Sequence, residues 1–324
     1  MDTPARAVSG LTPSAKTLFV AAAAHAMPHG AVVYVVPGDG DLDQAVADVA
    51  FFVSALEGLS DAVAERTILP FPSHEIDPYR GMAPHFGVQA ARARVLHALA
   101  RGTARVVVAS AAALMPRVSA PDRLLAASID LRPGQDIGPA DLAALLVDAG
   151  FSREDPADEH GEFARRGGIL DVYPAGEAEP VRIEFIGDTI ESMRTYDPAT
   201  QRSHKPIDQL TIVSLTDVLT AVAKADAGAE GDAALDRSAT VFDYLARVRD
   251  RRLIVSEWDE VDANGLKLAE QIARSYDEAA TRRPGGAAAA RPSELVIAWE
   301  EVADRKSTRL NSSHIQKSRM PSSA

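Results

Sequence analysis

Residues Gly10 to Thr17, with the sequence GLTPSAKT, nearly form a phosphate-binding loop. In such a loop, glycine before the lysine lets the backbone curl closely around the phosphates, and the following hydroxyl reaches magnesium. Here Lys16 and Thr17 are in place, but Ala15 stands where glycine is needed, and its Cβ would crowd the phosphates. No clear strand precedes Gly10, and Ser14 fits an ordinary helix N-cap. We therefore predict a degenerate, inactive phosphate loop at Gly10, Ala15, Lys16 and Thr17, against the alternative of a nucleotide hydrolase.

Metal chemistry has weaker support. The run DEHG at residues 158–161 resembles a helicase metal box in its letters alone. A working box needs an apolar strand that carries its first carboxylate to magnesium, and the preceding residues cannot form one. The apolar strands that could carry such a carboxylate end in Ser110 and Ser256, and Glu257 after the latter stands alone. We predict no metal site and no catalytic residue.

Two arginines, Arg166 and Arg182, lie in a run of short strands with turn residues between them. In Val181–Ile186 apolar residues alternate with polar ones, which places Arg182 on the solvent side, and Gly187-Asp188 supplies the next turn. Arginine makes paired hydrogen bonds to carboxylates or carbonyls, so the pattern favours a docking surface. The alternative is that both arginines form surface ion pairs with nearby glutamates, which contribute little to stability.

The elements that would position these residues fall into three parts. Residues 1–120 alternate helical and strand patterns, and Ala31–Val36 and Arg105–Ala109 are typical of strands buried on both faces. Residues 121–214 are rich in antiparallel strand signals, and residues 215–303 return to the first pattern. We predict an α/β fold with a parallel sheet, interrupted by an inserted α+β domain at 121–214.

Composition limits the classes of function. The 324 residues include 46% hydrophobic ones and no cysteine, which excludes disulfides and thiolate metal sites. The net charge of −12 would repel the phosphates of a DNA duplex and favours a protein partner. No signal peptide opens the chain, and the longest apolar run, Leu18 to Met27, is too short to span a bilayer. We expect a cytoplasmic protein with no membrane contact.

The last residues, Asp304 to Ala324, differ from the rest of the chain. They show no apolar period and do not continue the strand predicted at Leu295–Trp299. They resemble a translated sequencing adapter, so we treat 304–324 as a non-native tail outside the fold. We expect the natural protein to continue past Ala303 and this chain to be an N-terminal fragment. The alternative is a disordered basic tail with a role of its own.

Three segments carry a resemblance to a known family. They are RGGILDVYP at 166–174, RIEFIGDTIES at 182–192 and YDPATQR at 196–202. Together they resemble the module shared by the excision-repair protein UvrB and the bacterial transcription-repair-coupling factor. The resemblance implies a UvrA-binding domain inserted into a degenerate RecA-like, phosphate-loop sheet similar to UvrB domain 1.

The resemblance also implies which residues bind UvrA. Arg166 and Arg182 match arginines with which both families grip UvrA. The family pattern continues with two consecutive aromatic residues, of which the second helps form the contact. Here Phe185 is the first, and Ile186 replaces the second, which retains apolar area but loses ring-specific contacts.

The remainder of the chain separates the two families. UvrB, a nucleotide-dependent protein that binds damaged DNA, would need an intact phosphate loop and an aromatic hairpin. This chain has the degenerate loop, and only FPSHEIDPYRGMAPHFG at 71–87 stands where the hairpin would lie. The segments ARVVVAS at 104–110 and TVFDYL at 240–245 also match the coupling factor. We therefore favour the coupling factor over UvrB.

The resemblance to the coupling factor implies a function for the whole protein. That protein binds stalled RNA polymerase, displaces it with an ATP-driven DNA translocase and recruits UvrA. RNA polymerase and DNA would be contacted only through the missing C-terminal domains, and ATP and magnesium would bind there. We expect this fragment to need no cofactor, to bind UvrA, and to pack against the motor domains in the full-length protein.

Overall fold

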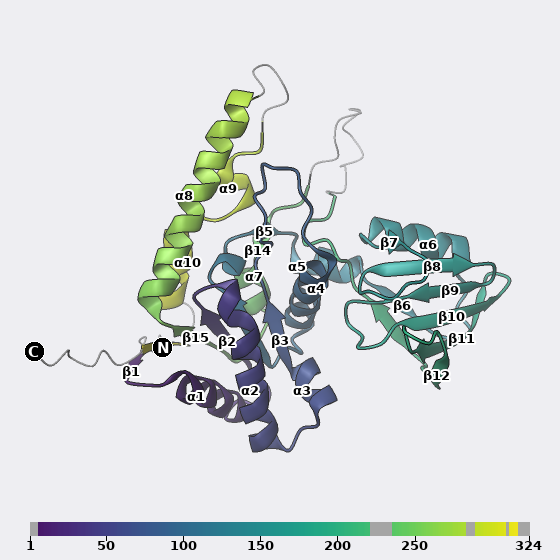
Figure 1. Ribbon diagram of the computed structural model, residues 1–324, viewed down its shortest axis with the longest axis horizontal. Helices are drawn as coiled ribbons and strands as arrows, with labels where there is room; N and C mark the ends of the chain where they lie inside the picture. The colour runs from purple at the N-terminus through teal and green to yellow at the C-terminus, as the bar shows by residue number, and fades with distance from the viewer. Residues whose placement is uncertain (1–5, 221–234, 283–288, 309–310, 317–324) are drawn as a thin grey trace, which may run out of the picture. The chain divides into compact units, whose positions relative to one another are not determined.

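The computed structural model describes residues 6–220, 235–282, 289–308 and 311–316. They form two compact units, which Figure 1 shows with their helices and strands. The first unit includes the described parts of Met1–Pro84, Ala98–Ala120 and Arg237–Ala324. The second includes His85–His97 and the described part of Pro121–Asp236.

A six-stranded parallel sheet forms the centre of the first unit. Its strands run in the order β1 (Arg6–Ser9), β16 (Asn311–Gln316), β15 (Arg251–Ser256), β2 (Ala31–Val36), β4 (Val106–Ser110) and β3 (Ile68–Phe71). Every residue of β2 and β4 is buried, because both are continuous apolar runs with neighbours on both faces. The predicted α/β class is thus confirmed.

The helices of the first unit pack against this sheet or against one another. They are α1 (Pro13–His25), α2 (Leu42–Glu57), α3 (Asp61–Thr67), α7 (Val241–Leu245), α8 (Trp258–Arg282), α9 (Pro292–Leu295) and α10 (Trp299–Thr308), with short turns η1 (Asp39–Asp41) and η2 (Ala112–Leu114). Val20 of α1 and Val49 of α2 lie in one buried cluster with Val32 and Ile254 of the sheet. A small antiparallel pair, β5 (Arg117–Val118) and β14 (Ala239–Thr240), completes the unit. None of the helices among the described residues is long and apolar enough to cross a membrane.

The strand predicted at Leu295–Trp299 is reduced to an isolated antiparallel bridge between Val296 and Pro116, and the residues at its two ends are helical. Leu295 ends α9 and Trp299 begins α10, which lies beside α8 (Figure 1). The reason is a long-range contact: the buried Trp299 ring packs so closely on Gly265 of α8 that a Cβ there would lie 2.1 Å from it. The indole nitrogen donates to the Asp262 carboxylate at 2.7 Å. Glycine at 265 makes room for the tryptophan, a feature that local strand propensity does not reveal.

The tail at 304–324 was predicted to lie outside the fold, and this is wrong for part of it. Helix α10 continues to Thr308, and β16 pairs with β15 on one side and β1 on the other. Parallel pairing uses backbone N–H and C=O groups, so a polar segment without apolar period can still join a sheet.

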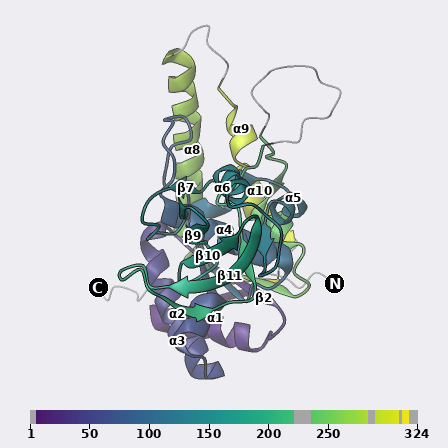
Figure 2. The same cartoon turned by 90° about the vertical axis from the view of Figure 1, so that its right-hand side faces the viewer.

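The second unit contains an antiparallel sheet, seen with its central strands toward the viewer in Figure 2. Its strands run in the order β12 (Ser203–Pro206), β11 (Thr189–Tyr196), β10 (Val181–Ile186), β9 (Ile169–Val172), β8 (Glu162–Arg166) and β7 (Ser152–Arg153). All these pairs are antiparallel except β7–β8, which is parallel. Helices α5 (Pro121–Ala126) and α6 (Pro139–Asp148) and the pair β6 (Ile129–Leu131) and β13 (Leu210–Ile212) belong to the same unit.

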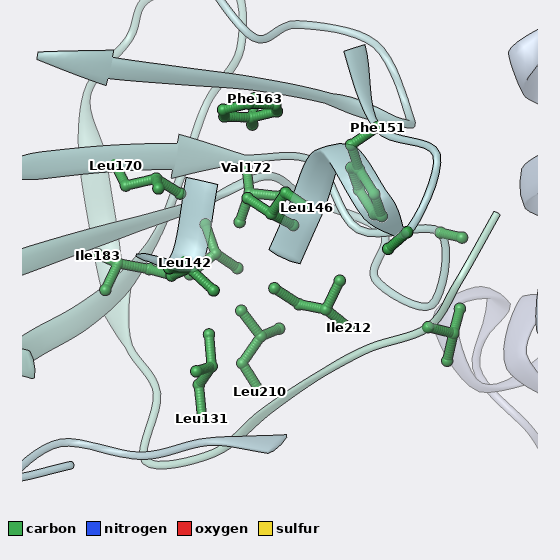
Figure 3. Close-up of a cluster of buried hydrophobic side chains, with 14 of the residues drawn as sticks. Leu131, Leu142, Leu146, Phe151, Phe163, Leu170, Val172, Ile183, Leu210 and Ile212 are labelled. Carbon is green, nitrogen blue, oxygen red and sulfur yellow. The ribbon is translucent and has the colours of Figure 1, made fainter. Parts of the chain in front are cut away.

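The inner face of this sheet packs against α6, β6 and β13. Figure 3 shows Leu142 and Leu146 of α6 pointing toward Leu170, Val172 and Ile183 of the sheet. All five side chains are completely buried. Burial of one such side chain stabilises the fold by about 1.5–3 kcal/mol, so this layer holds the sheet rigidly in place.

Residues His85–His97, the larger part of α4 (Phe86–Arg101), belong to the second unit, whereas the sequence analysis assigned all of 1–120 to the first domain. Ala90 and Ala93 lie in the core cluster of the second unit. The buried Arg92 donates to the Asp217 carboxylate at 2.6 Å. Apolar packing and a buried ion pair thus attach this helical segment to a sheet far along the sequence.

Candidate functional site

The antiparallel sheet of the second unit has an outer face, opposite its core, that carries polar side chains. Along β10 the side chains of Val181, Ile183 and Phe185 enter the core. Those of Arg182, Glu184 and Ile186 point the other way. Residues directly opposite in neighbouring strands share a face. Cross-strand pairing therefore defines the outer face as Arg166 of β8, Ile169 and Asp171 of β9, Arg182, Glu184 and Ile186 of β10, and Ser192 and Arg194 of β11.

Arg166 is at the exposed end of β8. Its Nε donates to Asp155 Oδ2 at 3.0 Å, and its Nη2 pairs with the other carboxylate oxygen of Asp155. These hydrogen bonds raise the pKa of Arg166 and lower the pKa of Asp155. Both side chains are more than half exposed, at 52% and 57%, so water screens the pair and a partner can reach it. Asp155, which sequence reasoning missed, is the actual neighbour of this arginine.

Arg182 is held within the unit instead of pointing freely to solvent as predicted. Its Nε and Nη2 donate to the two oxygens of the buried Asp171 at 2.7 and 2.8 Å. Its Nη1 donates to the Gln201 carbonyl at 3.2 Å, and the guanidinium lies 5.0 Å from the centre of the Tyr196 ring. The hydrogen bonds to Asp171 raise the pKa of Arg182, whose side chain is only 18% exposed. Asp171 lies directly opposite on β9, which explains why the strand pattern alone missed it.

Ile186 and Phe185 point in opposite directions. Ile186 is 65% exposed on the outer face, where Ile169, 37% exposed, adds further apolar area. Phe185, the other predicted partner-binding residue of this strand, is 9% exposed and packs in the core, so its side chain lies on the opposite side of the sheet from the outer face. The alternation along β10 already directs Phe185 inward, and the structure follows that alternation.

The degenerate phosphate loop lies in the first unit, and its context differs from the prediction. Strand β1 does precede Gly10, and α1 follows from Pro13, so the strand–loop–helix arrangement is present. The helix N-cap is Thr12 and not Ser14, because the Thr12 hydroxyl accepts from the Ala15 N–H at 3.4 Å. The loop backbone near Ala15 is therefore already engaged.

Lys16 and Thr17 are also engaged inside the protein. The Lys16 ammonium forms an ion pair with Glu257 and a 3.3 Å hydrogen bond with the Ser256 hydroxyl, and its side chain is 6% exposed. The Thr17 hydroxyl donates to the Ser14 carbonyl at 3.0 Å. Glu257, which stands alone in the sequence as a carboxylate, thus neutralises the Lys16 ammonium group that a phosphate would need.

A cavity of about 980 Å³ opens beside this loop, at the carboxyl ends of β2 and β15. Among the described residues that line it, the basic side chain is Lys16 and the carboxylates are Asp41, Asp48, Glu257, Asp259 and Glu260. Five carboxylates against one lysine give the cavity a negative potential, which repels polyphosphates.

The run at 158–161 forms a turn before β8. The backbone N–H groups of Asp158 and Glu159 donate to the Glu162 carboxylate at 3.1 and 3.0 Å. The His160 ring packs against the Tyr173 ring in a tilted arrangement, with their centres 4.0 Å apart. Within the described ranges, no group of three or more histidine, aspartate or glutamate side chains is arranged to hold a metal ion.

Comparison with known proteins defines the class of the second unit. Residues 129–217 match the UvrB interaction domain, so they include the inner layer and all strands of the outer face. The match covers residues 129–214 of the region 121–214 in which the sequence predicted an inserted α+β domain.

Similarity to known proteins also extends beyond the UvrB interaction domain, over about half to two thirds of this chain and a small part of each relative. The transcription-repair-coupling factor of Myxococcus xanthus is 35% identical over 198 residues, 59% of this chain and 16% of that protein. The factor of Bacillus subtilis (strain 168) is 31% identical over 159 residues, 49% of this chain and 13% of that protein. The factor of Escherichia coli (strain K12) is 28% identical over 158 residues. The chain carries a UvrB interaction domain and resembles transcription-repair-coupling factors, as predicted, over a small part of their length.

Proposed function

We propose that this chain is the N-terminal adaptor module of a transcription-repair-coupling factor and binds UvrA through the outer face. The observation that carries the proposal is the position of Arg166 and Ile186: both are exposed on one sheet face within the residues that match the UvrB interaction domain. The resemblance assigns UvrA binding to these two positions. An acidic chain with a net charge of −12 also fits a protein partner better than DNA.

The outer face can bind a protein without rearranging its core. Arg166 offers a planar guanidinium that exchanges its exposed Asp155 partner for acceptors on UvrA, while Ile186 buries apolar area. Arg182 contributes its remaining exposed edge and fixes the surface around it. In the whole protein, cytoplasmic UvrA would thereby be recruited to RNA polymerase stalled at DNA damage. Polymerase and DNA would be engaged by the C-terminal domains of the full-length factor, and this module would pack against the motor domains.

We also propose that this chain itself hydrolyses no ATP and needs no cofactor. Ala15 replaces the loop glycine, Lys16 is neutralised by Glu257, and the adjacent cavity is lined mainly by carboxylates. Each feature opposes binding of a nucleotide polyphosphate. ATP and magnesium would act in the motor domains that the resemblance places in the full-length factor.

The test of the docking proposal is binding of the purified chain to purified UvrA by calorimetry. We expect Arg166→Ala to raise Kd about tenfold, since loss of an interface arginine commonly costs above 1 kcal/mol. The matched control is Arg165→Ala, because Arg165 is also exposed on β8 but faces Leu170, on the core side. Absence of binding by the folded wild-type chain, or equal loss in both variants, would overturn the proposal.

A further inference from the structure

We infer that Arg194 is a specificity-determining residue of the outer face and that the partner presents a carboxylate to it. The inference rests on the proposed function. Arg194 lies on β11 directly opposite Arg182, in a cross-strand row that continues to Asp171 of β9 and to Pro206 of β12. It therefore shares its face with the two arginines that the sequence singled out.

A register shift places Arg194 on this face. Glu184 pairs with Ser192, but its neighbour Phe185 pairs with Ile190, so Glu191 has no opposite residue. Without that bulge, counting back from the turn would put Arg194 opposite Val181, on the core side. With the bulge, Met193 enters the core and Arg194 turns outward.

The guanidinium of Arg194 is available, unlike those of its neighbours. Arg166 is paired with Asp155, and Arg182 with Asp171. Arg194 is exposed, and within the described part of the chain its side chain makes no hydrogen bond or ion pair. Like charges directly opposite in a sheet are unfavourable, so the Arg182–Arg194 pair weakens the isolated domain slightly.

These positions identify the chemistry of the partner. A second carboxylate that approached Arg166 or Arg182 would meet Asp155 or Asp171 at close range, which opposes it. Arg194 faces Pro206 on its other side, which brings no charge. A carboxylate placed opposite Arg194 would gain charge-assisted hydrogen bonds and relieve the repulsion with Arg182.

The test measures Kd for UvrA with Arg194→Ala, Arg194→Lys and Arg194→Glu. We expect about tenfold weaker binding for Arg194→Ala, a greater loss for Arg194→Glu, and a smaller one for Arg194→Lys. The dependence of Kd on salt concentration should become shallower in Arg194→Ala. Its Tm should be equal to or above that of the wild type, because the like-charge pair is gone. Arg132→Ala, at an exposed arginine of the same unit outside the sheet, is the matched control.

The outcomes separate this inference from the proposed function. Weakened binding with an unchanged or raised Tm, and no change in the Arg132→Ala control, supports the role of Arg194. Binding within about twofold of the wild type for Arg194→Ala, while Arg166→Ala is weakened, overturns the inference and leaves the docking proposal intact. A wild-type chain that does not bind UvrA overturns both.

Discussion

The arginines of the outer face differ in what surrounds each guanidinium, and this decides what each can do. Arg182 forms two hydrogen bonds to Asp171, one to the Gln201 carbonyl, and a contact with the Tyr196 ring. Tyr196 in turn donates to the Ala157 carbonyl at 2.5 Å, and burial raises its pKa. Arg182 is therefore part of the structure of the domain as well as of its surface.

Removal of Arg182 should destabilise the fold. In Arg182→Ala the carboxylate of Asp171, which is 3% exposed, loses its paired donor and stays desolvated. We expect the free energy of unfolding to fall by about 2 kcal/mol, below the range for a fully buried ion pair because Arg182 is partly exposed. Urea denaturation of Arg182→Ala beside Arg165→Ala measures the difference. Equal unfolding midpoints would show that Asp171 finds another donor.

At the level of elements, the hairpin of β10 and β11 shows how far sequence reasoning reaches. The alternation in Val181–Ile186 and the turn at Gly187-Asp188 predict both strands. The bulge at Glu191 has no sequence signal of its own, so the place of Arg194 could not be predicted. The partner of Arg182 was equally hidden, because it depends on the register between β9 and β10.

In the first unit, too, local sequence patterns predict some elements and miss others. Continuous apolar runs predict β2 and β4 correctly, since burial on both faces leaves a local signature. The end of the chain does not follow local signals, because Trp299 is placed by its contact with Gly265. The strand before Gly10 was also missed, since four residues with a polar residue at each end give little pattern.

The turn that precedes β8 is an element whose stability should depend on pH. His160 packs on Tyr173 and its Nδ1 lies 3.1 Å from the Pro174 carbonyl. Burial, and to a smaller extent Arg94, lower the pKa of His160, while the hydrogen bond to Pro174 opposes the shift. In the unfolded chain the imidazole takes up a proton near its ordinary pKa, and in the folded chain only at lower pH.

The free energy of unfolding should thus fall as pH drops below about 6.5 toward the lowered pKa of His160. Above that range the imidazole is neutral in both states and makes no difference. We expect His160→Gln to show a flatter decline of stability between about pH 7 and pH 5 than the wild type. The exposed His204 gives the control variant His204→Gln. Parallel pH profiles for wild type and His160→Gln would contradict the role of His160.

At the scale of the whole molecule, the two units differ in the kind of site that each contains. The second unit carries the outer face, through which we propose that the chain binds its partner. The first unit keeps the strand–loop–helix of a phosphate site, but an internal carboxylate holds its lysine. A ligand that binds only the folded state raises the free energy of unfolding by RT ln(1 + [L]/Kd). Nucleotide binding by the first unit can therefore be tested through the thermal stability of the intact chain.

We expect about 1 mM ATP with magnesium to leave the Tm of the chain unchanged, since a ligand that does not bind the folded state cannot stabilise it. The same measurement on Glu257→Gln separates two causes. If the ion pair with Lys16 alone excluded nucleotide, this variant would gain stability from ATP. Because Asp41, Asp48, Asp259 and Glu260 remain around the cavity and Ala15 remains in the loop, we expect no gain. A rise in Tm of the wild-type chain with ATP would contradict the proposed inactivity and restore the nucleotide hydrolase as the leading alternative.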